Sequence, residues 1–140
     1  AGAVTRLRDM GIEPFLLASS LIGVIAQRLV RKLCPHCKRA YTATASECVL
    51  LGLDAAAPPT LHAAVGCAQC LDSGYRGRSG VYDLVLVDET LRGLIHDGAA
   101  EATLEEHARR HTPSLFDDGR RRLLAGDTSL DELLRVTQMQ

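Results

Sequence analysis

Two Cys-x-x-Cys pairs carry most of the chemistry that this sequence could perform. The first knuckle contains Cys34 and Cys37, and the second contains Cys67 and Cys70, with residues 38–66 between them. Each knuckle places two thiolates on one tight turn, and two such pairs together supply the four ligands of a tetrahedral metal ion. Because four thiolates leave no coordination position open for a substrate, the spacing indicates a closed structural site.

Other cysteine chemistries are less consistent with this pattern. Disulfide bonds would require an oxidising compartment, yet no signal-peptide pattern opens the sequence, and pairing would leave the fifth cysteine, Cys48, alone. A redox site of the thioredoxin kind needs only one pair. Iron remains an alternative, since the spacing is similar to that of rubredoxins and thiolate tetrahedra accept either metal. The sequence has no Trp and few other aromatic residues, unlike rubredoxins, so zinc is favoured.

Two further residues lie close to these ligands in the sequence. His36 is inside the first knuckle, and we expect it to face solvent instead of replacing a cysteine. Cys48 lies in a short apolar run, and we expect it to be a small buried hydrophobic residue. The predicted ligands of the zinc ion are therefore Cys34, Cys37, Cys67 and Cys70.

The elements that must position the knuckles can be read from the periodicity of apolar residues. A strand is predicted over residues 24–33 and leads directly into the first knuckle, and another over 60–65 brings Cys67 back towards Cys34. The other predicted elements are helices over residues 3–10, from Pro14 onward and over 45–51, a glycine-rich turn over 72–80 and a strand over 81–87. Phe15 and Leu16 belong to a helix that is apolar around most of its girth, so we expect them to be largely buried.

Four short amphipathic helices are predicted between Asp88 and Val136. Capping boxes at residues 103–106 and 129–132 mark two of their starts, and we expect the charged side chains of these helices to face solvent. His107 and His111 are four residues apart and could share a helix face, but Pro113 predicts that this helix ends near them.

Size, charge and motifs exclude several classes of function. The 140 residues suit one domain or two small ones, a net charge of −1 gives no global attraction to nucleic acid, and no interleaved aromatic residues support stacking on bases. The longest mostly apolar run, residues 14–26, is too short to cross a bilayer. No nucleophile triad, metalloprotease spacing or phosphate-binding glycine run is found, so we expect no catalytic and no cofactor-binding residue here.

Several longer motifs resemble those of one known family. The sequence is similar to the type II secretion traffic ATPases over essentially its whole length, in residues 6–21, 26–31, the Cys34-Pro35-His36-Cys37 knuckle, 70–78, 81–82 and 129–136. The related type IV pilus assembly ATPases share the tetracysteine module. The sequence motifs at residues 13–17 and 27–30 look closer to those of the secretion branch.

This resemblance implies an α+β fold in three segments. Residues 1–33 would be the tail of a RecA-like α/β core, residues 34–75 a tetracysteine zinc-binding subdomain, and residues 76–140 a strand with a C-terminal bundle of short helices. The parent protein would be a hexameric ATPase that powers type II protein secretion through pseudopilus assembly. The family's P-loop lies upstream, so ATP and Mg²⁺ belong to the parent protein, and this fragment alone would not be an enzyme.

The same resemblance implies partners and a location. The parent homohexamer would lie in the bacterial cytoplasm, peripheral at the cytoplasmic face of the inner membrane. It would bind the inner-membrane platform protein and the bitopic assembly protein of the secretion machine. Two alternatives stay open: the C-terminal region of a type IV pilus assembly ATPase, or a free-standing tetracysteine module that carries electrons like rubredoxin or binds nucleic acid.

Overall fold

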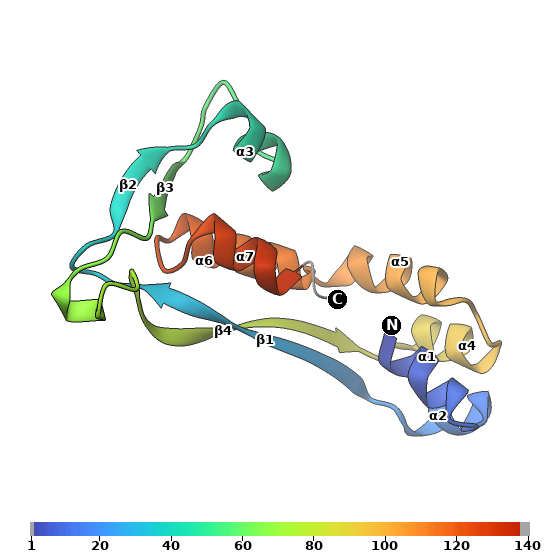
Figure 1. Cartoon of the computed structure of the whole chain (residues 1–140). Coiled ribbons are helices and arrows are strands. Elements are labelled where there is room, and N and C mark those ends of the chain that lie inside the picture. Colours follow the sequence, from blue (N-terminus) through green and yellow to red (C-terminus); the bar gives the residue numbers. More distant parts are fainter. Residues whose placement is uncertain (1, 138–140) are drawn as a thin grey trace. The chain divides into compact units, whose positions relative to one another are not determined.

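Helices and strands are mixed along the chain in the computed structural model, which describes residues 2–137 (Figure 1). This confirms the expected α+β class. The elements in chain order are α1 (Gly2–Asp9), α2 (Pro14–Ser20), β1 (Gly23–Leu33), β2 (Arg39–Thr42), α3 (Ala45–Leu51), β3 (Thr60–Ala63), the 3₁₀ turn η1 (Ala68–Cys70), β4 (Tyr75–Leu86), α4 (Glu89–His96), α5 (Glu101–His111), α6 (Leu115–Leu124) and α7 (Leu130–Thr137).

The chain forms two compact units, each assembled from two separate stretches of sequence. The first unit comprises residues 1–26 and 83–114, and the second comprises residues 27–82 and 115–140. The boundaries between the units fall within β1 and β4, because these strands supply residues to both. The three segments expected from the sequence, 1–33, 34–75 and 76–140, stay a prediction.

The first unit is a group of four short helices around a small apolar core. Helix α2 packs on α4, α4 on α5 and α5 on α1, and the buried core residues are Val4, Leu17, Ala18, Val85, Leu91, Ile95, Leu104 and Ala108. The expected burial of Phe15 and Leu16 is wrong, because their exposed fractions are 53% and 47%. Only the face of α2 that carries Leu17 and Ala18 meets the core. Within residues 2–137, no helix is long and apolar enough to span a membrane.

The second unit places the small β2–β3 sheet beside helices α3, α6 and α7. Strands β2 and β3 are antiparallel, with Arg39 opposite Ala63 and Thr42 opposite Thr60. Their shared core is formed by Ala43, Cys48, Leu51, Leu61, Leu123, Leu130 and Leu133. Strand β2 was not predicted from the sequence, because its four residues carry no clear apolar alternation and it forms by pairing with β3.

The long strands β1 and β4 pair with each other and run antiparallel. The Val87 N–H donates to the Ile22 carbonyl at 3.0 Å near one end, and the Cys34 N–H donates to the Gly74 carbonyl at 2.9 Å near the other. Strand β4 begins at Tyr75, so the glycine-rich turn predicted over residues 72–80 is mostly strand. Pairing with β1 supplies backbone hydrogen bonds that outweigh the low strand propensity of these glycines.

The helix starts agree in part with the capping motifs. Helix α5 begins at Glu101, so the predicted capping box that starts at Thr103 is wrong, and Thr103 lies inside the first turn. Ser129 accepts the backbone N–H of Glu132 at 3.3 Å, which forms half of the second predicted box. The carboxylate of Glu132 does not complete that box, because it is engaged by two arginines.

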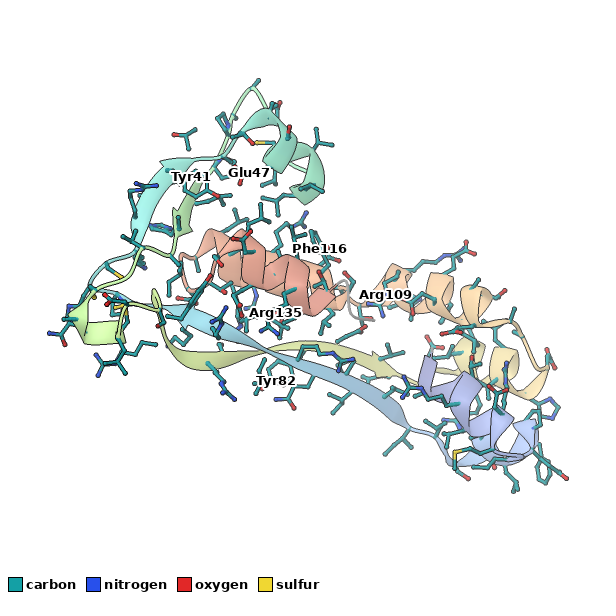
Figure 2. The ribbon with its side chains drawn as sticks, viewed as in Figure 1. Tyr41, Glu47, Tyr82, Arg109, Phe116 and Arg135 are labelled. Carbon is teal, nitrogen blue, oxygen red and sulfur yellow. The ribbon has the colours of Figure 1, made fainter. Side chains whose placement is uncertain are left out.

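Glu132 is a buried carboxylate that links β1 to α7. Its side chain is 2% exposed and forms ion pairs with Arg31 at 2.7 Å and with Arg135 at 2.9 Å, and it also accepts the Arg31 backbone N–H. Figure 2 shows Arg135 projecting from α7. Burial alone would raise the pKa of Glu132, but the hydrogen bonds from the two arginines outweigh it and lower this pKa to about 2. The expectation that every charged residue of these helices faces solvent is therefore wrong at this position.

Acid should weaken the second unit through Glu132. Because folding lowers the pKa of this carboxyl from 4.5 to about 2, its stabilisation is complete above pH 4.5 and is lost as the pH falls towards 2. A Glu132→Gln variant should lose about 1.5–3 kcal/mol of unfolding free energy at neutral pH and show a flatter acid limb. Urea unfolding across the acid range measures both.

The neighbouring Asp131 supplies the matched control for this test. Its side chain lies on the exposed surface of the same helix turn, so Asp131→Asn should leave the acid limb unchanged. Equal behaviour of the Glu132→Gln and Asp131→Asn variants would contradict the assignment of the acid-sensitive stability to the buried carboxylate.

Candidate metal centre

The first knuckle forms where β1 ends. The Cys34 N–H is held by the Gly74 carbonyl at 2.9 Å, and the Lys38 N–H donates back to the Cys34 carbonyl at 3.1 Å, which closes the turn. Cys34 is fully buried, and Cys37 is half-buried. Hydrogen bonds at both ends of this turn therefore fix the backbone that carries the two thiols.

The second knuckle is wound more tightly, around η1. The Cys67 carbonyl accepts the N–H groups of Cys70 at 3.2 Å and Asp72 at 2.8 Å. Leu71 and Asp72 have φ angles of 55° and 61°, a left-handed conformation that residues with a side chain rarely adopt. This backbone wraps the chain around the sulfur of Cys70, which is itself buried.

The two knuckles bring their four sulfur atoms together. The distance between Sγ atoms is 3.8 Å for Cys34 and Cys67, 3.8 Å for Cys37 and Cys70, and 3.7 Å for Cys67 and Cys70. All of these cysteines are free, and the separations far exceed a disulfide bond of about 2.05 Å. Four thiolates around a tetrahedral metal at about 2.3 Å would lie about 3.8 Å apart. The four sulfurs are thus spaced to hold one metal ion.

Backbone N–H groups around the sulfurs favour thiolate over thiol. The Gly66 N–H donates to Cys37 Sγ at 3.3 Å, and the N–H groups of Cys67 and Gly74 each donate to Cys70 Sγ at 3.2 Å. Burial would raise the pKa of Cys70, but its two N–H donors and the neighbouring thiols lower it to about 6. A thiolate at this position is the form that binds a metal.

Cys37 shows the opposite shift, and the contrast has a simple cause. Its Gly66 donor lowers the pKa of the thiol, but burial and the three neighbouring cysteines outweigh this donor and raise the pKa to about 11. Four sulfurs so close together cannot all carry a negative charge without a cation among them. The cluster is therefore a cation-binding arrangement by its electrostatics as well as by its spacing.

The loop between α6 and α7 holds the backbone around both knuckles. Leu33, just before the first knuckle, donates its N–H to the Asp127 carbonyl at 2.8 Å, and the Lys38 ammonium donates to the Gly126 carbonyl at 3.0 Å. After the second knuckle, the Tyr75 hydroxyl contacts the Ser129 hydroxyl at 2.7 Å. No sequence motif marks these contacts, because they join residues far apart in the chain through ordinary backbone carbonyls and hydroxyls.

The structure also locates the other residues considered from the sequence. Cys48 is fully buried in the core beside Leu51 and Leu61 and lies outside the sulfur cluster, as expected. His36 is exposed, also as expected. Strand β3 ends at Ala63, slightly earlier than predicted, and returns the chain so that Cys67 meets Cys34.

Gly74 is a position where the centre requires the absence of a side chain. Its φ is +82°, and a Cβ atom there would lie 2.6 Å from the Cβ of Ala64. Gly77 has a similar φ of +78° but open space around it. We expect Gly77→Ala to cost about 1 kcal/mol through its backbone conformation, and Gly74→Ala to cost about 1–3 kcal/mol more through the clash.

Urea unfolding of the metal-loaded proteins compares the two glycine variants directly. Chelator competition in the same samples should show weaker metal retention in Gly74→Ala alone, because the Gly74 N–H also supports Cys70. Equal stability and equal metal retention in both variants would contradict the packing role of Gly74.

Comparisons with known proteins agree with these features. The sequence profile of the family described as "Type II/IV secretion system protein" matches residues 1–135. The chain is 59% identical over 137 residues to "Type II secretion system protein E" of Pseudomonas aeruginosa and 53% identical over 137 residues to "Type II secretion system ATPase E" of Vibrio cholerae. A third relative, "Type II secretion system protein E" of Aeromonas hydrophila, is 50% identical over the same length.

These alignments cover nearly all of the chain but only part of each relative. They include 98% of this chain and 27% of each of the three relatives, so the chain spans about a quarter of their length. A profile match over residues 1–135, together with identities of 50–59%, assigns the chain to a family. The chain belongs to the type II/IV secretion system protein family.

Proposed function

We propose that this chain is the zinc-binding C-terminal region of a hexameric ATPase that powers type II protein secretion through pseudopilus assembly. The observation that carries the metal assignment is the spacing of 3.7–3.8 Å between the sulfurs of the two knuckles. The secretion assignment is supported by relatives at 50–59% identity that are named type II secretion proteins. ATP and Mg²⁺ would act in the parent protein, outside this quarter of its length.

Zinc is the metal that we propose for Cys34, Cys37, Cys67 and Cys70. Two half-buried and two buried thiols leave no position open for a substrate, which suits a structural ion without redox activity. Iron would fit the same sulfur geometry, but a rubredoxin-like electron carrier does not fit membership of a secretion family. The ion would cross-link the turn that follows β1 to η1 and thereby fix the shape of residues 34–75.

The exposed apolar residues of β1 support a place beside a larger core. Ile25 is 70% exposed and Leu29 is 46% exposed, and both point away from the buried Val30 as strand alternation requires. On the partner strand β4, Leu86 is 66% exposed. In our proposal residues 1–33 are the tail of a RecA-like core, whose remaining strands and helices would cover these side chains.

The partners and the location follow from the same proposal. The parent protein would act as a homohexamer at the cytoplasmic face of the inner membrane, against the platform protein and the bitopic assembly protein. A type IV pilus assembly ATPase is the second candidate, because the resemblance seen in the sequence extends to these ATPases, which share the tetracysteine module. The names of the relatives favour the secretion branch.

The zinc assignment predicts one zinc ion per chain. Elemental analysis after gentle purification should find it, and Cys37→Ser should lose it, whereas Cys48→Ala should keep it because Cys48 packs in the apolar core. Zinc binding is worth about 10–16 kcal/mol in small peptide sites, so a chelator should at least unfold residues 34–75. Iron in the purified protein, or less than about half an equivalent of zinc, would overturn the assignment.

We further propose that residues 34–75, stiffened by the metal, pass movement of the ATPase core to a partner protein and take no part in phosphate chemistry. This role predicts a separation between ATP hydrolysis and secretion. In the full-length protein, Cys67→Ser with Cys70→Ser should abolish secretion and leave much of the basal ATP hydrolysis, because the metal centre transmits motion and touches no phosphate. Cys48→Ala is the matched control and should secrete normally. Normal secretion by the double variant would refute the role, and so would complete loss of hydrolysis in a protein that remains folded.

A further inference from the structure

A second group of metal-binding side chains lies in the first unit, away from the cysteines. It consists of Asp88, which caps α4, and of His107 and His111, which lie one turn apart near the end of α5. Helices α4 and α5 pack on each other, and Figure 1 shows them side by side. From the sequence, His107 and His111 could share a helix face near the predicted end of the helix, and α5 includes both histidines and ends at His111. The approach of Asp88 to them was not predicted.

The three side chains converge closely. His107 Nε2 lies 3.1 Å from Asp88 Oδ1 and 3.0 Å from Oδ2, and the centroids of the two imidazole rings are 4.9 Å apart. One ligand atom from each residue can be chosen so that all of them lie within 4.8 Å of one another. Donors bound to one tetrahedral zinc ion at about 2.0–2.1 Å are about 3.3 Å apart, so small side-chain movements would complete the site.

We propose that Asp88, His107 and His111 form a second metal site that binds a divalent transition-metal ion of the zinc type. Two imidazoles and a carboxylate are the donor set that suits borderline ions such as Zn²⁺, and water would fill the remaining position. Two histidines spaced by four residues on a helix present their rings on one face, so the helix itself sets the distance between these two ligands.

The chemistry of the three residues allows metal binding without loss of the helix cap. Asp88 Oδ1 accepts the Leu91 N–H at 2.7 Å, and a carboxylate has further lone pairs with which it can bind a cation. The His107 Nε2 that faces the carboxylate donates a hydrogen in the metal-free protein. Metal binding requires the lone pair of that nitrogen, so the proton moves to Nδ1 in a neutral ring or leaves to water from an imidazolium.

The surrounding charges do not oppose a cation. His107 and His111 are in the last two turns of α5, where the negative end of the helix dipole favours positive charge, and this offsets the unfavourable N-terminus of α4 beside Asp88. The neighbouring Arg109, labelled on α5 in Figure 2, is held by Asp83 at 2.7 Å and by Glu105. Arg110 pairs with Glu106 at 3.0 Å.

A simple hydrogen bond between α4 and α5 would explain only part of the group. It accounts for Asp88 and for the burial of His107, whose side chain is 12% exposed. It does not account for the imidazole of His111, which lies tilted at 57° against the ring of His107. As a metal site, the group would join the start of α4 to the end of α5 and stabilise the first unit, independently of the tetracysteine centre.

Calorimetric titration of the whole chain with Zn²⁺, after its tightly bound metal has been allowed to load, tests the proposal. The wild-type chain should bind one more equivalent than His111→Gln, because loss of a ligand should weaken the site by more than about 100-fold. Asp88→Asn should also lose this equivalent while it retains the helix cap. His96→Gln is the matched control, since His96 is exposed at the end of α4 and its Nδ1 lies 3.4 Å from the exposed Asp97.

A thermal melt supplies an independent readout. Zn²⁺ in excess should raise the Tm of the wild-type chain and of His96→Gln above the Tm of the singly loaded protein, because the ion binds the folded first unit, and it should not do so for His111→Gln. Equal stoichiometry in wild type and His111→Gln would overturn the proposal. A Zn²⁺-dependent Tm increase of the same size in wild type and His111→Gln would also overturn the proposal. Neither result depends on the metal content of the cysteines.

Discussion

Mutual repulsion among four sulfur atoms is the constraint on which the second unit depends. Neighbouring sulfurs in the cluster of Cys34, Cys37, Cys67 and Cys70 are 3.7–3.8 Å apart. At this separation four thiolate charges cannot coexist without a cation among them. The pKa of Cys37 is raised and the pKa of Cys70 is lowered, because the same repulsion prevents all four free thiols from ionising together. A bound cation would remove this repulsion and cross-link the two knuckles within residues 34–75.

The elements around the cysteines could not hold this shape by themselves. Strands β2 and β3 form an isolated pair of four residues each, and such a pair is marginal in water. Their apolar face is covered by Cys48 and Leu51 of α3 and by three leucines of α6 and α7, Leu123, Leu130 and Leu133. The loop before α7 adds backbone acceptors at Gly126 and Asp127 that fix the entry and the exit of the first knuckle. The C-terminal helices are therefore part of the support of the metal centre.

A buried group of ion pairs also supports the strand that leads into the first knuckle. Glu132 is buried, and a buried carboxylate is tolerated only when its oxygens are fully satisfied. Arg31 and Arg135 satisfy them from β1 and α7, and Arg31 also lies 4.2 Å from the ring centroid of Tyr75. The strand that enters the first knuckle is thus fixed by charge where α7 meets it, which suits a region that we propose to transmit movement.

The sequence by itself determined the local features. Cysteine spacing predicted which four thiols lie together, the apolar alternation of residues 24–33 predicted β1, and the exposed His36 and buried Cys48 were expected from their neighbours. These signals are local, since each depends on residues within a few positions of one another. Where an element depends on a partner, the sequence was silent or wrong, as for β2, the early start of β4, the exposure of α2 and the first turn of α5.

Only the tertiary structure decided which distant residues meet. The pairing of Glu132 with Arg31, the contacts of the α6–α7 loop with both knuckles, and the approach of Asp88 to His107 join residues separated by 19 to 101 positions. Acidic, basic and histidine side chains such as these also occur on ordinary exposed surfaces. No local pattern in the sequence therefore distinguishes these residues. Their environment arises from the packing of whole elements, because burial and proximity, not residue identity alone, set the electrostatics of each group.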